Sequence, residues 1–274
     1  MKRKRIIRKL IKKIILSFKK YFGEIVTGVV IGLIVLILTP LVNNIINEKL
    51  YKHELADNLS SVSLGMSKNY IDELFGQPII ENEYQDVVRW YSDHSTEETF
   101  ISAGYKLKNS VLLCLYCRKS LVAFVVAVNE TNLYRIPSNM YIGECCLLDF
   151  TYYDFSPDAT VFEGNVPSNN DVYAYYTELY DGAGPADYNY FLIGSYRDYR
   201  EESCADTLML IGQDYAWDNT FHYYNEEQHN TARKNTQPNV FGIVSSTFSD
   251  EFNFVMDIIG DRTNGTLLFQ DWYE

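Results

Sequence analysis

The sequence has 274 residues, and its 24 basic and 36 acidic side chains give a formal net charge of −12 at pH 7. Such an acidic chain lacks the basic surface that phosphate contacts need, which argues against nucleic acid as a partner. Five cysteines are too few for a small disulfide scaffold, and a hydrophobic fraction of 47% is enough to build a folded core.

The first 23 residues form a strongly basic arm. Ten Lys or Arg occur among the first twenty residues, with no acidic residue between them. Isoleucine and phenylalanine recur among these charges at helical spacing, which is typical of an amphipathic helix lying on an anionic membrane surface. We therefore expect residues 1–23 to lie on the anionic inner leaflet. The alternative is that the charges serve only to set the membrane topology.

An uncharged apolar run follows, IVTGVVIGLIVLILTPLV at residues 25–42. A helix of this length covers roughly 27 Å, about the thickness of the hydrocarbon core of a bilayer. The run has no polar face of the kind that a helix at the surface of a soluble protein shows. We predict a transmembrane helix over residues 24–47 that contacts the lipid bilayer, marked by Ile25, Gly28, Gly32, Leu36 and Val42.

The flanking charges predict the orientation of this helix. Basic residues beside a membrane span stay in the cytoplasm, so the N-terminus is expected inside and residues 48–274 outside. The predicted location is the inner (cytoplasmic) membrane, crossed once by an uncleaved signal anchor. A cleaved signal peptide is the alternative, but it would have a shorter apolar region and a small-x-small site, which the residues after Pro40 do not offer.

Residues 48–59 are expected to form a stalk, in continuation of the helix. A short helix should then begin after Ser67, because Ser is a favoured N-cap, and end at Gly76 before Pro78. Strand-like runs follow it, and a short turn at residues 118–120 joins the last two as a hairpin. The predicted strands are Val87–Tyr91, Phe100–Leu107, Val111–Tyr116 and Leu121–Val128.

Residues 60–128 resemble the small bacterial envelope domains of the SmpA/OmlA (BamE-like) type. In that family a helix with a Gly-Met-Ser/Thr start and a Leu-Gly-x-Pro finish precedes an antiparallel sheet. The matching residues here are Gly65, Met66, Ser67, Leu74, Gly76 and Pro78, with Phe75 inserted. The layout also resembles an uncharacterised family of single-pass bacterial membrane proteins. The resemblance implies an envelope-facing interaction fold and no catalytic residue.

The second half of the outer part repeats this order of elements faintly. Residues 170–182 are predicted to form a capped helix, followed by Pro185 and a strand at Tyr188–Tyr196. This is a hint of a duplicated unit. Two more strands are expected at Thr207–Gly212 and Val240–Phe248. A helix at Asp250–Ile259 and a hairpin turn at Asn264-Gly265 before Thr266–Trp272 complete the prediction.

The cysteines favour packing over chemistry. Cys114 and Cys117 have the spacing of a redox or zinc motif, but they lie in a run that is typical of a buried strand, where their side chains would face opposite sides. Cys145 and Cys146 are adjacent, so a bond between them is not expected. The sequence leaves the redox state of these four and of Cys204 open.

Enzyme signatures are mostly absent: the sequence has no Gly-x4-Gly-Lys-Ser/Thr, Gly-x-Gly-x-x-Gly, Gly-x-Ser-x-Gly or His-Glu-x-x-His motif. We expect no enzyme, no metal and no cofactor. One group could hold a zinc-like ion, because a helix would place Asp218, His222, Glu226 and His229 on one face. The polarity of that segment favours an exposed loop instead.

Tyrosines crowd residues 152–199, and tyrosine suits recognition surfaces because it joins a stiff contact area to a polar tip. The alternative is ordinary sheet packing. The candidate binding face consists of Tyr173, Tyr176, Tyr180, Tyr188 and Tyr190.

The predicted fold class is therefore α+β, with one N-terminal transmembrane helix and an antiparallel-sheet domain with a few short helices. The outer part is either one domain or two related subdomains, at residues 60–130 and 131–274. The predicted function is a non-enzymatic binding module of the bacterial envelope, whose partner is an envelope protein or a surface ligand. The alternatives are an envelope-directed hydrolase and a signalling or defence component that oligomerises through Gly28 and Gly32.

Overall fold

The structure is a computed structural model that describes seven segments of the chain. They are residues 2–89, 95–136, 145–157, 161–165, 173–181, 189–198 and 226–245; within the first helix many side chains are left out, those of residues 23–35 among them. The chain divides into two compact units, Met1–His53 and Glu54–Glu274, and each is described by itself.

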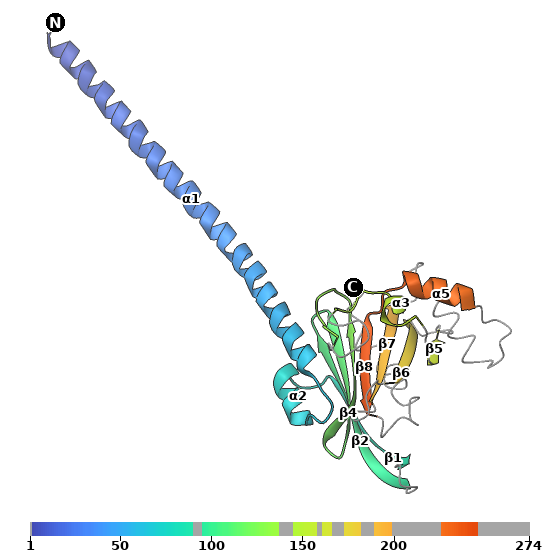
Figure 1. Cartoon of the computed structure of the whole chain (residues 1–274). Helices are drawn as coiled ribbons and strands as arrows, with labels where there is room; N and C mark the ends of the chain where they lie inside the picture. Colours follow the sequence, from blue (N-terminus) through green and yellow to red (C-terminus); the bar gives the residue numbers. More distant parts are fainter. Residues whose placement is uncertain are drawn as a thin grey trace. The chain divides into compact units, whose positions relative to one another are not determined.

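A single helix, α1 (Lys2–Ser61), makes up the first unit and enters the second (Figure 1). It runs without a break through the segments predicted as basic arm, membrane span and stalk, so the residues between the span and Ser61 are helical. Among the residues that the structure describes, no helix is long and apolar enough to cross a membrane. The predicted span falls largely on side chains outside that description.

The short helix α2 (Lys68–Phe75) begins and ends where the sequence predicts. The hydroxyl of Ser67 accepts a hydrogen bond from the backbone N–H of Tyr70, 3.3 Å away, and so satisfies one of the free donors of the first turn. Gly76 ends the helix at φ +84°, a conformation that glycine adopts without strain.

Among the described residues, one antiparallel sheet of eight strands forms the body of the second unit (Figure 1). Its spatial order is β1-β2-β3-β4-β8-β7-β6-β5. The α+β class with an antiparallel sheet is thus confirmed. The strands are β1 (Ile80–Arg89), β2 (Ser95–Leu107), β3 (Ser110–Cys117), β4 (Ser120–Val128), β5 (Val161–Asn165), β6 (Tyr173–Asp181), β7 (Asn189–Asp198) and β8 (Val240–Ser245).

The predicted hairpin between β3 and β4 is present, and its turn has two residues. Cys117 pairs with Ser120, which leaves Arg118 and Lys119 in the turn, both at positive φ (50° and 69°). A two-residue turn with both residues at positive φ has a backbone twist that matches the right-handed twist of the two strands it joins.

The last described strand, β8, lies in the middle of the sheet. It pairs with β4 on one side and with β7 on the other, and so joins strands from residues 60–130 to strands from residues 131–274. Gly242 in β8 sits where the strands approach closely, since a Cβ atom there would lie 3.0 Å from the carbonyl oxygen of Phe124.

The helix predicted over residues 170–182 is wrong. Residues 173–181 form the strand β6, which pairs with β5 and β7. The hint of a duplicated unit rested on that helix and loses its basis. The predicted strand at Tyr188–Tyr196 is confirmed as β7, and the described part of Val240–Phe248 is β8. The elements predicted at 207–212 and 250–272 lie outside the described residues.

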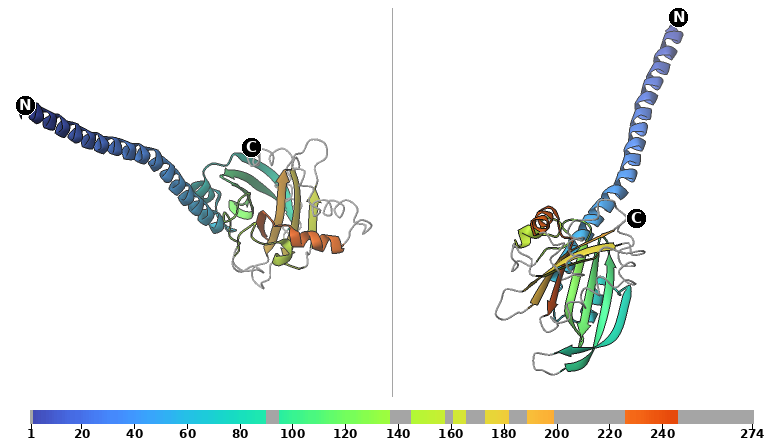
Figure 2. Two further views of the ribbon diagram at one scale, coloured as in Figure 1. Left: turned by 90° about the horizontal axis from the view of Figure 1, so that it is seen from above. Right: turned by 90° about the vertical axis from the view of Figure 1, so that its right-hand side faces the viewer.

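The core lies against one face of the sheet. There the end of α1 contributes Leu55 and Leu59, α2 contributes Ile71, and both pack with strand residues such as Phe124 and Phe241. Two further helices, α3 (Tyr152–Phe155) and α5 (Glu226–Asn235), lie near one end of β6 to β8 (Figure 2). Strand residues of the opposite face are buried too, for example Leu113, Val125 and Leu192.

Candidate functional site

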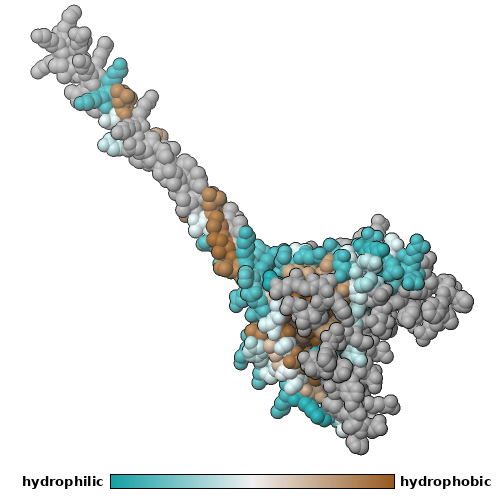
Figure 3. Space-filling view, in the orientation of Figure 1, coloured by the Kyte–Doolittle hydropathy of each residue, from teal (hydrophilic) through white to brown (hydrophobic). Residues whose placement is uncertain are grey.

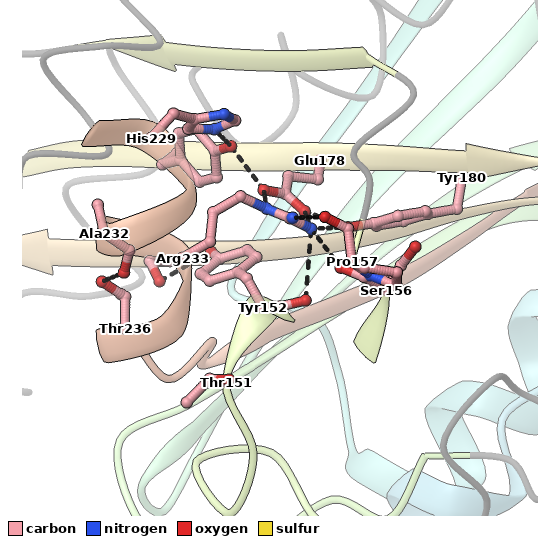
Figure 4. A network of polar contacts seen from close by, with 12 residues as sticks. Thr151, Tyr152, Ser156, Pro157, Glu178, Tyr180, His229, Ala232, Arg233 and Thr236 are labelled. Carbon is pink, nitrogen blue, oxygen red and sulfur yellow. Dashed lines mark hydrogen bonds and ion pairs between the residues drawn. The ribbon is translucent and has the colours of Figure 1, made fainter. Parts of the chain in front are cut away.

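The most distinctive polar feature is a buried ion pair between α5 and β6 (Figure 4). Arg233 Nε lies 2.6 Å from Glu178 Oε1, and Arg233 Nη2 lies 2.9 Å from Glu178 Oε2. Both residues are 0% exposed. The two parallel bonds form the bidentate pair that a guanidinium and a carboxylate make best.

The remaining donors of Arg233 tie this helix to the segment after α3. Nη1 donates to the carbonyl oxygen of Pro157, and Nη2 donates to that of Ser156, each at 2.7 Å. Burial alone would lower the pKa of Arg233, but the hydrogen bonds and negative charge of Glu178 outweigh it and raise this pKa. Arg233 therefore stays charged and holds β6, α5 and residues 156–157 together.

Two tyrosines of β6 complete the shell of the carboxylate. The hydroxyl of Tyr176 donates to Glu178 Oε1 at 2.6 Å, and the hydroxyl of Tyr180 donates to Oε2. Burial, followed by the negative charge of Glu178, raises the pKa of both tyrosines. The three side chains alternate with their neighbours along the strand and so point to the same side of the sheet.

His229 extends the network on the other side of Tyr176. Its Nε2 lies 2.7 Å from the Tyr176 oxygen. Because the Tyr176 proton is donated to Glu178, this nitrogen must carry a hydrogen and donate, which sets the tautomer of the ring. Burial, and next the charge of Arg233, lower the pKa of His229 to about 4. The imidazole is therefore neutral at pH 7.

This network is closed to ligands. Arg233, Glu178, Tyr176, Tyr180 and His229 are each at most 2% exposed. A substrate has no access to groups buried to this degree, and the charges they carry are already matched. The geometry is that of a structural ion pair with its hydrogen bonds satisfied.

The predicted tyrosine binding face is corrected by these positions. Tyr176 and Tyr180 are buried in the network, so they offer no surface to a partner. Tyr190 lies in β7 and is half-buried. Tyr173 lies in β6, but its side chain is outside the described residues. Tyr188 is wholly outside them. The binding face was predicted on a helix, but residues 173–181 form a strand. Successive side chains of a strand point to opposite faces of the sheet, so the helical spacing of the tyrosines does not place them all on one face.

Sequence reasoning missed Glu178 and Arg233 altogether. For Glu178 a signal was present: Tyr176, Glu178 and Tyr180 alternate with their neighbours, and such alternation indicates a strand with these three side chains on one face. Arg233 carried no signal, since a single arginine in a polar segment looks like any solvated cation.

The candidate metal group also takes a different form. Asp218 and His222 lie outside the described residues, whereas Glu226 and His229 belong to the first turn of α5, so the exposed loop predicted there is wrong from residue 226 on. Glu226 is exposed and His229 is buried. Within the described segments no group of three His, Cys, Asp or Glu residues is arranged to hold a metal ion.

Four cysteines are described, and each is a thiol outside any disulfide. Cys114 and Cys117 are buried in β3, which confirms the prediction that they pack in a strand. Cys145 and Cys146 are half-buried. Burial raises the pKa of the Cys114 thiol to about 12 and that of Cys145 to about 11.

The first unit presents a large exposed apolar surface. Leu36 is 71% exposed and Leu38 is 50% exposed, and Figure 3 shows hydrophobic residues gathered along the helix. Large apolar side chains seldom lie this close together on the surface of a soluble protein. The exposed residues between 36 and 50 are Leu36, Ile37, Leu38, Val42, Ile46 and Leu50.

Comparison with known protein families, curated proteins and solved structures found no match to this chain. The fold and its surfaces are therefore interpreted from their own chemistry.

Proposed function

We propose that this chain is a membrane-anchored binding module of the bacterial envelope. The uncharged part of α1 crosses the inner membrane once, the basic arm lies on the cytoplasmic leaflet, and the sheet unit projects outside. The module works by holding a partner, without chemistry of its own.

The observation that carries this proposal is the exposed apolar surface of α1. Leu36, Ile37 and Leu38 are each at least 50% exposed, and they belong to the charge-free run at residues 25–42. A helix that is apolar all round needs lipid or a large protein core to cover it. Lipid is the simpler cover, because the run is about as long as a bilayer is thick.

The charges before and after the apolar run support the proposed orientation of the helix, with its N-terminus in the cytoplasm. Ten basic residues precede the run, whereas the residues after position 20 hold 14 basic and 36 acidic side chains. Lys and Arg close to a span are retained in the cytoplasm, where the anionic leaflet attracts them, so the ten basic residues before the run favour an N-terminus inside. The order of α2 and the antiparallel strands supports the envelope assignment, since it is the order expected from the BamE-like resemblance.

Membrane extraction tests the anchor. A double variant, Leu36→Arg with Ile37→Arg, places two charges in the apolar run, and each costs about 2.5–3.5 kcal/mol at the centre of a membrane helix. We expect the native chain to remain in the membrane pellet after alkaline carbonate treatment and the double variant to move to the supernatant. A reporter enzyme active only outside the cytoplasm, fused after residue 274, should be active on the native chain.

Leu50→Arg with Tyr51→Arg is the matched control. These residues are also exposed on α1 (63% and 44%), but they lie beyond the charge-free run. The control should stay in the pellet. Equal release of both variants, or an inactive reporter on the native chain, would contradict the proposed anchor and its orientation.

A further inference from the structure

The strand β1 forms one edge of the sheet. Among the described strands it pairs only with β2, and the register runs without a break through ten residue pairs, from Ile80–Gly104 to Arg89–Ser95. The strand at the other edge, β5, has five residues. A long edge with regular pairing presents a row of main-chain donors and acceptors that another strand can pair with.

Natural edge strands usually carry features that prevent such pairing. Charged side chains (lysine above all), proline, a bulge or a very short length are the common ones. The sequence of β1, IENEYQDVVR, has no proline, and its pairing with β2 shows no register shift. Its charged residues are three acids and one arginine, so the protection that it carries is mainly negative charge. Such an edge disfavours an acidic strand, including a second copy of itself, and leaves pairing open to a strand that carries basic side chains.

The side chains of β1 indicate what that neighbour is. Glu81 and Glu83 are exposed on one face of the strand, where Glu81 already attracts a cation, Lys68 Nζ at 2.8 Å. On the other face Tyr84 stacks on Phe100, with ring centroids 5.7 Å apart and planes at 14°. An added strand would set alternate side chains beside carboxylates on one face and beside an aromatic surface on the other.

We propose that β1 binds an extended peptide in which basic and apolar side chains alternate, added to the sheet as a further strand. This inference rests on the proposed function, since it names the partner class of the binding module. Main-chain hydrogen bonds would supply affinity, and the alternating side chains would supply selectivity. A second copy of the chain fits less well, because pairing β1 with itself brings glutamates of both copies together.

A labelled peptide tests the proposal directly. The probe is the acetylated octapeptide TKVKVRVT carrying a fluorophore, titrated into the full chain in detergent micelles and followed by fluorescence anisotropy. A peptide with Glu at the three basic positions should bind at least tenfold more weakly. A peptide with all its internal backbone amides N-methylated should lose measurable binding, because it cannot pair with a strand edge.

Two protein variants locate the site. Glu83→Lys should weaken binding of the basic probe about fivefold, the effect of about 1 kcal/mol from one exposed charge. Glu227→Lys makes the same charge change at an exposed position of α5 and should leave binding unchanged. Amide hydrogen exchange within residues 80–89 should slow on binding, while that of β5 should not.

Several outcomes would overturn the proposal. They are equal binding of the N-methylated peptide, equal effects of the two variants, and no binding of the basic probe at 1 mM. A dimer by light scattering whose β1 amides are protected without peptide would assign the edge to a second copy. None of these readouts depends on membrane extraction, so failure of the anchor and failure of this edge are distinguishable.

Discussion

Arg233 and Glu178 face each other across the boundary between α5 and β6, 2.6 Å apart and with no exposed surface. Neither residue belongs to a regular apolar pattern, yet together they hold three segments that are far apart in the sequence. Burying two charges costs several kcal/mol per ion, which good geometry and further hydrogen bonds must offset.

The first prediction concerns the loss of one partner. Arg233→Met leaves Glu178 as an unpaired buried carboxylate and should lower the free energy of unfolding by about 3–5 kcal/mol. The double variant Arg233→Met with Glu178→Gln removes the stranded charge and should be more stable than Arg233→Met alone. Thermal unfolding followed by circular dichroism measures both.

Arg118→Met is the control for this first prediction. Arg118 also pairs with a carboxylate, that of Glu98, through a bond of 3.0 Å from its Nε, but its side chain is 63% exposed. Its loss should leave the melting temperature almost unchanged. A double variant no more stable than Arg233→Met would show that charge burial is not the cause of the loss.

The second prediction is a pH dependence from His229. Its pKa in the folded chain is about 4, below the value of about 6.5 for an unfolded histidine. Between these values the unfolded chain binds a proton that the folded chain does not, so stability falls as the pH falls from 6.5 to 4. The loss reaches about 3 kcal/mol near pH 4 and vanishes above about pH 7.5.

His229→Gln isolates this contribution. The Gln amide can still donate to Tyr176 but does not titrate, so the variant should show a flatter fall in stability over the same pH range. Urea unfolding at half-unit intervals of pH gives the comparison. Parallel curves for the native chain and the variant would mean that His229 is not the titrating group.

The third prediction concerns the thiols. Cys145 and Cys146 are half-buried and should react with iodoacetamide in the native chain, whereas Cys114 and Cys117 should react only after unfolding. Since the thiolate is the reactive form, the raised pKa of Cys145, about 11, predicts a rate that increases up to high pH. Peptide mass spectrometry identifies the modified residues. Early modification of Cys114 would contradict the buried position in β3.

The fourth prediction concerns the basic arm. A peptide of residues 1–23 should bind vesicles that contain anionic lipid and should leave neutral vesicles largely free, because each basic residue near an anionic surface contributes about 1 kcal/mol. Raising the salt concentration should weaken the binding. Co-sedimentation measures it, and a peptide with its ten basic residues changed to Gln is the control. Equal binding to neutral vesicles would show that the apolar residues act alone.

Much of the fold of residues 60–128 was predictable, because the signals there are local. Ser67 and Gly76 mark the ends of α2 by cap chemistry that acts within one turn. The strands β3 and β4 are continuous apolar runs separated by a two-residue turn. Strands β1 to β4 are consecutive in sequence and adjacent in the sheet, so local sequence signals were sufficient to predict their pairing.

The fold of the second half was harder to predict because its residue patterns fit both a helix and a strand. Tyr173, Tyr176 and Tyr180 fit a helical spacing, while Tyr176, Glu178 and Tyr180 fit a strand alternation, and pairing with β5 and β7 decided in favour of the strand. No local signal shows that Arg233 meets Glu178, since 55 residues separate them in sequence. The buried network is a product of tertiary packing.

The central place of β8 has a consequence for synthesis. The ribosome must add more than a hundred residues after β4 ends at Val128 before Val240 begins the strand that joins the two halves. At about 5–20 residues per second this takes on the order of ten seconds. Throughout that interval the inner edge of β4 has no β8 to pair with, and the inner edge of β7 shares this state once Asp198 has been made. A chaperone that shields extended edges would have its substrate there.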